Sequence, residues 1–139
     1  MNGEPATRGL VDTNIVIQLH RLDPARLPDE MVISAITLAE LSAGPHSTDD
    51  PAERARRTNI LQHVEAVFDP LPFDAEAARA FGLVSAAVLA AGRQPRRRVA
   101  DLMIAAVAQV HGLPLYTTNV DDFAGLDGLV GIVAVPLRS

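Results

Sequence analysis

The chain has 139 residues, of which 48% are hydrophobic and 21% charged, and its formal net charge is −5. This length indicates a single domain, and the hydrophobic share is too high for a disordered chain. The sequence contains no cysteine, which excludes disulfides, thiolate zinc sites and a cysteine nucleophile. It contains no lysine either, which excludes a P-loop lysine, a Schiff-base lysine and a lysine general base.

Targeting signals are not evident in the sequence. The apolar runs are broken by Gly, Arg or Asp well short of the roughly 18 residues that a membrane span requires. The N-terminus lacks the basic start and apolar run of a signal peptide. We therefore expect no membrane association and a cytoplasmic location. Residues 1–8 are predicted to be a disordered or extended lead-in to one domain over residues 9–139.

Segments typical of strands alternate along the chain with segments of helical periodicity. Strands are predicted over residues 9–12, 31–36, 113–118 and 131–137. Helices are predicted over residues 15–21, 37–44, 51–68, 74–91 and 101–112, with a short helical segment over 119–123. The proline-rich segment 69–73 is predicted to be a short strand or an extended crossover. The alternation indicates an α/β domain whose central, mostly parallel sheet of four to five strands is covered by helices on both faces.

Acidic residues recur at the ends of predicted strands and in the first turns of predicted helices. Asp12 ends the first strand, Glu40 lies one turn into the helix after the second, Asp101 lies in the first turn of a strongly apolar helix, and Asp121 and Asp122 follow a later strand. In a parallel sheet these junctions share one edge, so the carboxylates are expected to meet. Clustered carboxylates repel one another unless a cation intervenes, and a hard cation such as Mg²⁺ or Mn²⁺ accepts their oxygens.

Each acid also has a purely structural explanation. Asp12 is a suitable helix cap, and Thr37-x-x-Glu40 has the pattern of a capping box. Asp101 suits the positive end of a helix dipole, and Asn119 with Asp122 is compatible with capping. The repeated placement of these residues at the ligand-binding end of the sheet favours a common site.

Four stretches resemble one protein family. They are LVDTN at the start, the segment with Ser34, Thr37 and Glu40, the segment DLMIAAVAQVHGLPLYTTN, and VDDF. Together they look like the PIN domain, and they are most similar to the VapC-type toxin ribonucleases of type II toxin–antitoxin pairs. The resemblance extends over the chain from Gly9 onward, and the block from Asp101 to Asn119 is its most specific part.

The resemblance implies a PIN-like fold and a set of acidic site residues. Asp12, Glu40 and Asp101 match the first three acids of the family, whereas the fourth position falls on Asn119, an amide; we expect Asp121 to compensate. The resemblance further implies an RNA substrate, metal-dependent phosphodiester hydrolysis, homodimerisation and inhibition by a VapB-like antitoxin. Aliphatic faces of the helices within residues 37–68 and 74–91 are the expected dimer surfaces.

These residues lead to a mechanistic hypothesis. Asp12 and Asp101 are expected to hold Mg²⁺, with Glu40 and Asp121 acting through water or a second ion. Other polar side chains near them are expected to orient the ligands, namely Asn14, Thr118 and Asn119.

A basic loop precedes Asp101 in the sequence and contains Arg96, Arg97 and Arg98. Its arginines are expected to attract the RNA backbone, and a solvated loop or a dimer contact is the alternative.

Two other functions are compatible with clustered acids. A phosphoacceptor signalling domain requires a lysine near the acids, which this sequence lacks. A catalytically inactive PIN-like domain that only binds RNA or a protein partner is the remaining alternative, and Asn119 is the residue that favours it.

Overall fold

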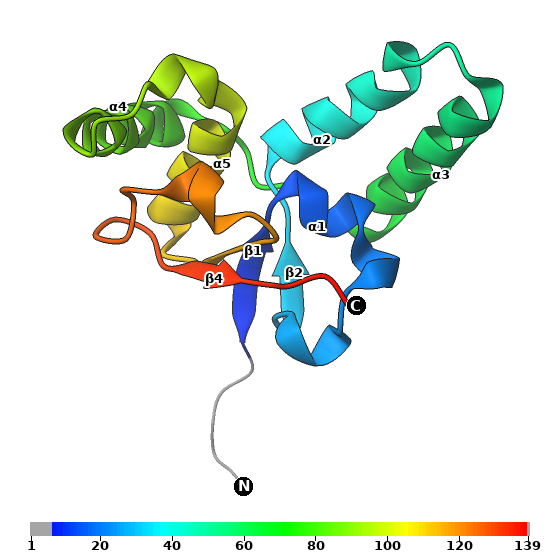
Figure 1. Cartoon of the computed structure of the whole chain (residues 1–139), viewed down its shortest axis with the longest axis horizontal. Coiled ribbons are helices and arrows are strands. Elements are labelled where there is room, and N and C mark those ends of the chain that lie inside the picture. Colours follow the sequence, from blue (N-terminus) through cyan, green and yellow to red (C-terminus); the bar gives the residue numbers. More distant parts are fainter. Residues whose placement is uncertain (1–6, 139) are drawn as a thin grey trace, which may run out of the picture.

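A computed structural model describes residues 7–138 of the chain. Its centre is a sheet of four parallel strands in the order β2–β1–β3–β4 (Figure 1). The strands are β1 Arg8–Val11, β2 Glu30–Val32, β3 Leu115–Thr117 and β4 Ile132–Ala134. The predicted fold class is confirmed, and the sheet is wholly parallel.

Five α-helices connect and cover the strands of the described part. They are α1 Thr13–Ile17, α2 Ala35–Ala43, α3 Pro51–Val67, α4 Ala75–Ala90 and α5 Val99–His111. Asp50 and Asp74 cap α3 and α4 through their carboxylates, and Gly112 ends α5 in the left-handed conformation at φ 63°. Short 3-10 turns lie between these elements, at Leu19–Arg21, Pro24–Arg26, Gly44–Ser47, Pro95–Arg97 and Val120–Phe123.

Some predicted boundaries are wrong by a few residues. Helix α2 begins at Ala35, before the predicted start at Thr37, because the Ser34 hydroxyl caps it by accepting the Thr37 N–H at 3.2 Å. Helix α5 likewise begins two residues before Asp101. The predicted capping box of Thr37 and Glu40 is therefore not the start of this helix.

Helices cover the two faces of the sheet because successive strand residues point to opposite sides. Leu10 packs in a cluster with α4 and α5, whereas the next residue, Val11, packs in a second cluster with α1 and α3. Leu115 and Tyr116 of β3 divide in the same way. Figure 1 shows the pair α4 and α5 on one side of the strands and the pair α2 and α3 projecting on the other.

The strand order creates a switch point at the carboxyl edge of the sheet. From β1 the chain moves outward to β2, then returns across β1 to β3 and continues to β4. The loops after β1 and β3 therefore diverge, and open α/β sheets bind ligands at such a point. Asp12 follows β1 directly, and the turn Val120–Phe123 follows β3.

Two peripheral segments complete the described part. Residues 69–73 form an extended crossover, which is one of the two predicted alternatives. Leu71 makes a single parallel bridge with Ser34, next to β2, and the Leu71 N–H donates to the Ile33 carbonyl at 2.9 Å. The predicted lead-in of residues 1–8 ends inside β1, because Arg8 belongs to that strand; residues 1–6 lie outside the described residues. Within residues 7–138, no helix has both the length and the apolar character that crossing a membrane requires.

Candidate active site

Asp12 lies at the centre of the carboxyl edge, and it both caps a helix and faces the site. Its side chain is only 3% exposed. One carboxylate oxygen accepts the Ile15 N–H at 3.2 Å, and the other accepts the Thr117 hydroxyl at 2.6 Å. Burial raises the pKa of Asp12, and the hydrogen bonds from Thr117 and from the backbone of Ile15 and Asn14 oppose that rise. Asp12 therefore caps α1, as its structural explanation predicts, and also lies at the candidate site.

Thr117 is a site residue that the sequence analysis missed. It is fully buried at the end of β3, donates to Asp12 and accepts the Asn119 N–H at 3.0 Å. Strand alternation is the signal that identifies it, since Leu115 and Thr117 share the buried side of β3 while Tyr116 and Thr118 are less buried. A buried hydroxyl at the carboxyl end of a strand has to find a polar partner there.

Asp101 has a strongly perturbed carboxylate. It lies in the first turn of α5, and its pKa is raised to about 6. Burial is the largest cause, followed by the negative charges of Asp122, Asp12 and Glu40, while Arg98 acts in the opposite direction. The structure thus brings three of the predicted acids within electrostatic reach of one another, together with Asp122.

Glu40 reaches the same edge from α2. Its Oε1 accepts the Thr13 hydroxyl at 2.5 Å, and Thr13 also lies 3.0 Å from the Thr37 hydroxyl. Thr13 directly follows Asp12 in the chain, so this hydrogen bond ties Glu40 to the residue next to the first acid. Glu40 remains exposed and available to a ligand.

Asp121 and Asp122 point to different surroundings. Asp121 is 68% exposed and pairs with Arg93 at 2.9 Å, whereas Asp122 is 22% exposed and pairs with Arg98. The charge of Asp122 raises the pKa of both Asp12 and Asp101. Both acids belong to the 3-10 turn Val120–Phe123, where neighbouring side chains diverge by about 120°. The structure therefore brings Asp122 to the cluster and turns Asp121, the predicted fourth acid, towards Arg93.

The other predicted polar residues lie around the carboxylate cluster, nearer the surface of the protein. Asn14 and Asn119 are exposed, and Thr118 is half-buried. Asn14 contributes its backbone N–H to Asp12, and Asn119 donates its own to Thr117. Ligand orientation by these three side chains stays a prediction.

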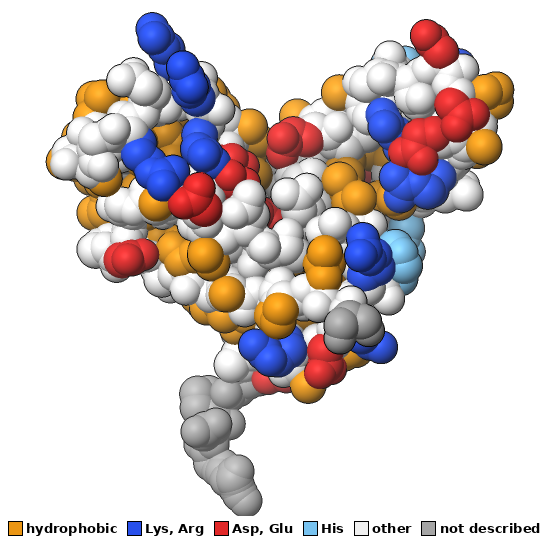
Figure 2. Space-filling view, viewed as in Figure 1, with side chains coloured by type: hydrophobic (Ala, Val, Ile, Leu, Met, Phe, Trp, Pro, Cys, Tyr) orange, Lys and Arg blue, Asp and Glu red, His pale blue; other side chains and the backbone are white. Residues whose placement is uncertain are grey.

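The basic loop borders the acids from the side of α4 and α5. Arg96 and Arg97 are exposed, while Arg98 is half-buried against Asp122. Arg93, which was not predicted, joins them through Asp121. Figure 2 shows acidic side chains in the notch between the two lobes of the molecule, with basic side chains next to them on the lobe of α4 and α5.

A hard divalent cation fits the donor chemistry of this edge. The described residues hold no ready-made group of three Asp, Glu or His side chains at metal-binding geometry. Mg²⁺ commonly uses one or two carboxylates together with water and substrate phosphate, so a closed cage is not required. Burial and, after it, the neighbouring negative charges raise the pKa of Asp101, and a cation bound there would act in the opposite direction.

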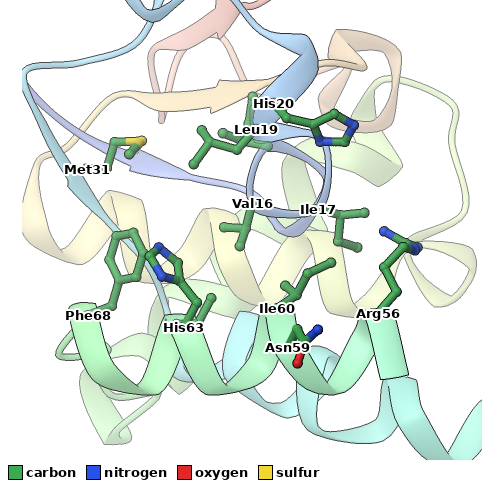
Figure 3. Close-up of a pocket in the computed structure, with 12 residues that line it drawn as sticks. Val16, Ile17, Leu19, His20, Met31, Arg56, Asn59, Ile60, His63 and Phe68 are labelled. Carbon is green, nitrogen blue, oxygen red and sulfur yellow. The ribbon is translucent and has the colours of Figure 1, made fainter. Parts of the chain in front are cut away.

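A separate apolar hollow of about 500 Å³ lies between α1 and α3. In Figure 3, Val16 and Ile17 approach Ile60, while His63 and Phe68 line the side nearer Met31. The hollow is lined by apolar side chains for the most part, and it is distinct from the carboxylate cluster.

This fold and this arrangement of acids define a PIN-type domain. The family model for the PIN domain matches residues 9–129, and the chain belongs to that family. The chain is 38% identical over 135 residues to ribonuclease VapC5 of Mycobacterium tuberculosis, a match that covers 95% of this chain and 96% of the relative. These matches confirm the resemblance to VapC proteins.

Solved structures agree with this assignment. The crystal structure of VapBC-5 from Mycobacterium tuberculosis, a member of the VapBC family of toxin–antitoxin systems, superimposes with a TM-score of 0.80 at 37% identity; the match covers 96% of this chain and all of that one. FitAcB from Neisseria gonorrhoeae matches with a TM-score of 0.71 at 26% identity, covering 89% of this chain and 95% of that chain.

Proposed function

We propose that this protein is a metal-dependent endoribonuclease that hydrolyses RNA phosphodiester bonds and acts as the toxin of a toxin–antitoxin pair. The observation that carries the proposal is the carboxylate cluster around Asp101 at the switch point of the sheet, in which Asp122 pairs with Arg98 while Asp12, Glu40 and Asp101 form no ion pair with another described residue. The relatives support it, since VapC5 is named a ribonuclease and VapBC-5 is a member of the VapBC family of toxin–antitoxin systems.

In this proposal Asp12 and Asp101 hold Mg²⁺, and Mn²⁺ is an acceptable substitute. Glu40 and Asp122 complete the negative surroundings, so Asp122 replaces Asp121 as the fourth acid. A cation held by Asp12 and Asp101 would supply Lewis-acid polarisation of the scissile phosphate and activation of a water molecule as nucleophile.

Two threonines position these carboxylates. The Thr117 hydroxyl holds one oxygen of Asp12 at 2.6 Å and thereby favours its charged form. The Thr13 hydroxyl holds one oxygen of Glu40 at 2.5 Å. The second oxygen of Glu40 stays available to a cation or to its water. The lone pairs of Asp12 that accept no hydrogen bond are available in the same way.

The test is cleavage of structured RNA by the purified protein in Mg²⁺, with chelator as the control. We expect cleavage in Mg²⁺, its loss in chelator, and its recovery when Mg²⁺ or Mn²⁺ is restored. Asp101→Asn should remain inactive under every condition. A wild-type protein that binds RNA but never cuts it would support the inactive PIN-like alternative instead.

The proposal includes two protein partners. A VapB-like antitoxin is proposed to cover the protein, and the apolar hollow between α1 and α3 offers it a surface that Ile60 and Phe68 help to form. A second copy of the chain is proposed as a homodimer partner. Ile60→Asp should weaken antitoxin binding without changing RNA cleavage, which titration calorimetry and a cleavage assay can separate.

A further inference from the structure

A small basic hollow lies beside the carboxylate cluster, between α4 and α5. Its volume is about 240 Å³, and its lining consists of Arg93, Gln94, Arg97 and Arg98. No carboxylate belongs to that lining, although the acidic cluster is adjacent. Arg96 occupies the same 3-10 turn as Arg97 but does not line the hollow.

Two ion pairs hold the walls of this hollow in place. Arg93 reaches the Asp121 carboxylate at 2.9 Å and the Asp121 backbone carbonyl at 3.3 Å. Arg98 pairs with Asp122. These contacts connect the loop before α5 with the turn after β3, and they orient two guanidinium groups before any ligand arrives.

Arg97 is the arginine of this lining that neither ion pair includes. Among residues 7–138 it takes part in no ion pair, and its side chain is exposed. The lining of the hollow therefore carries two guanidinium groups that are paired with carboxylates outside it and a third, that of Arg97, that is in no ion pair with a described residue. Guanidinium groups bind phosphate in a bidentate manner, and Gln94 adds an amide donor.

We propose that this hollow binds a backbone phosphate of the substrate RNA, next to the phosphodiester that is cut. The proposal rests on the ribonuclease function and adds a subsite to it. The ion pair of Arg98 with Asp122 places the hollow next to the carboxylate cluster, so a strand lying across both would contact them together. The hollow thereby offsets the repulsion between RNA and an acidic cleft, and it sets which linkage lies over the carboxylates.

The test compares Arg97→Gln with Arg79→Gln. Both variants lose one positive charge from the same lobe, but Arg79 is an exposed residue of α4 away from the hollow. For Arg97→Gln we expect the KM for RNA cleavage in Mg²⁺ to rise roughly tenfold with kcat little changed. For the same variant, the slope of the logarithm of the RNA-binding constant against the logarithm of the salt concentration should become shallower by about 0.7. This is the amount for one phosphate contact on a single strand. Arg79→Gln should match the wild type in both measurements.

A second arm locates the phosphate. Methylphosphonate groups replace single linkages of a short RNA, one at a time, and binding is measured by fluorescence anisotropy in chelator. The wild type should lose affinity when the linkage beside the cut is neutral, and Arg97→Gln should be insensitive at that linkage. Because both substituted side chains are exposed, urea unfolding should show the variants to be as stable as the wild type.

The outcomes separate the subsite from the function. If the wild type cuts RNA and Arg97→Gln behaves like Arg79→Gln, the subsite is refuted and the ribonuclease function stands. If no RNA is cut but the wild type loses affinity at one methylphosphonate linkage and Arg97→Gln does not, the ribonuclease function fails and the phosphate-binding subsite stands. If Arg97→Gln loses affinity for the antitoxin while its RNA affinity is unchanged, the hollow binds an acidic protein segment and the proposal is overturned.

Discussion

Acidic side chains in two regions of this molecule have opposite electrostatics. On α3, Glu53 accepts hydrogen bonds from Arg56 and Arg57, and its pKa is lowered to about 2, chiefly by those bonds. At the carboxyl edge of the sheet, Asp101 is partly buried and lies near other carboxylates. Burial and, after it, these negative charges raise its pKa to about 6. The chain neutralises the first carboxylate by itself and leaves the second in need of a cation.

This difference separates acidic residues that stabilise a helix from acidic residues that form a candidate binding site. Glu53 has local partners three and four positions along the same helix, an arrangement that stabilises helices. The carboxylates of Asp12, Asp101 and Glu40 come from three separate segments and form no ion pair with another described residue. Clustering of like charge costs stability, so its presence at one edge points to a ligand.

The largest expected effect comes from removing the carboxylate of Asp101. Asp101→Asn should lower the rate of RNA cleavage by roughly three orders of magnitude, because a lost cation ligand costs several kcal/mol of transition-state stabilisation. Single-turnover cleavage in Mg²⁺ measures this loss. Glu53→Gln is the matched control and should cut at the wild-type rate, since its carboxylate is already satisfied by arginines. Equal losses in the two variants would remove the distinction between the regions.

The next effect distinguishes two neighbouring residues. Asp122→Asn should reduce cleavage by about a hundredfold, because its charge acts on both Asp12 and Asp101. Asp121→Asn should lose less than about tenfold, through looser placement of Arg93. Cleavage assays over a range of Mg²⁺ concentrations test both. The reverse order would restore the assignment of the fourth acid to Asp121.

A smaller effect is expected from the hydroxyl that holds Asp12. Thr117→Val keeps the shape of the side chain but leaves a buried carboxylate oxygen without its donor. Cleavage should fall roughly tenfold and stability by about 1–3 kcal/mol. Thr117→Ser should restore both, and a shift of the cleavage pH profile in Thr117→Val would distinguish positioning of Asp12 from simple destabilisation.

The pH dependence of stability should have opposite signs in the two regions. Because the folded-state pKa of Asp101 is raised to about 6 from 3.8, its ionisation destabilises the fold above pH 6, and this penalty disappears as the pH falls towards 4. In chelator at pH 7, Asp101→Asn should therefore be about 1–2 kcal/mol more stable than the wild type, a figure that allows for solvent screening. Urea unfolding at pH 7 and pH 4 measures this gain, which Mg²⁺ should reduce by stabilising the wild type. A variant less stable than the wild type at pH 7 contradicts this explanation.

The smallest effect belongs to Glu53. Its folded-state pKa is lowered from 4.5 to about 2, so its contribution to stability is present above pH 4.5 and is lost as the pH falls towards 2. Glu53→Gln should be slightly less stable at pH 7, and the difference should shrink in high salt because the site is exposed. Thermal unfolding at two salt concentrations checks this, and a stabilised variant would show that the arginine pairs are not favourable.

The sequence by itself determined the layout of this protein. Apolar periodicity and local capping residues define the helices, as at Asp50, Asp74 and Gly112, because these signals act within a few residues of the chain. The parallel sheet and the edge where Asp12, Glu40 and Asp101 meet follow from the alternation of strands and helices. These are consequences of short-range chemistry together with one topological rule.

Only the tertiary structure decided which side chains complete the site. Thr117 contacts Asp12 across 105 positions of sequence, and Arg93 contacts Asp121 across 28. The choice between Asp121 and Asp122 depends on the direction of each side chain within one 3-10 turn. Sequence spacing places both acids at the right edge, but the direction of a side chain is set by packing against distant elements. For that reason the folded chain was required both to propose Asp122 as the fourth carboxylate and to find the basic hollow.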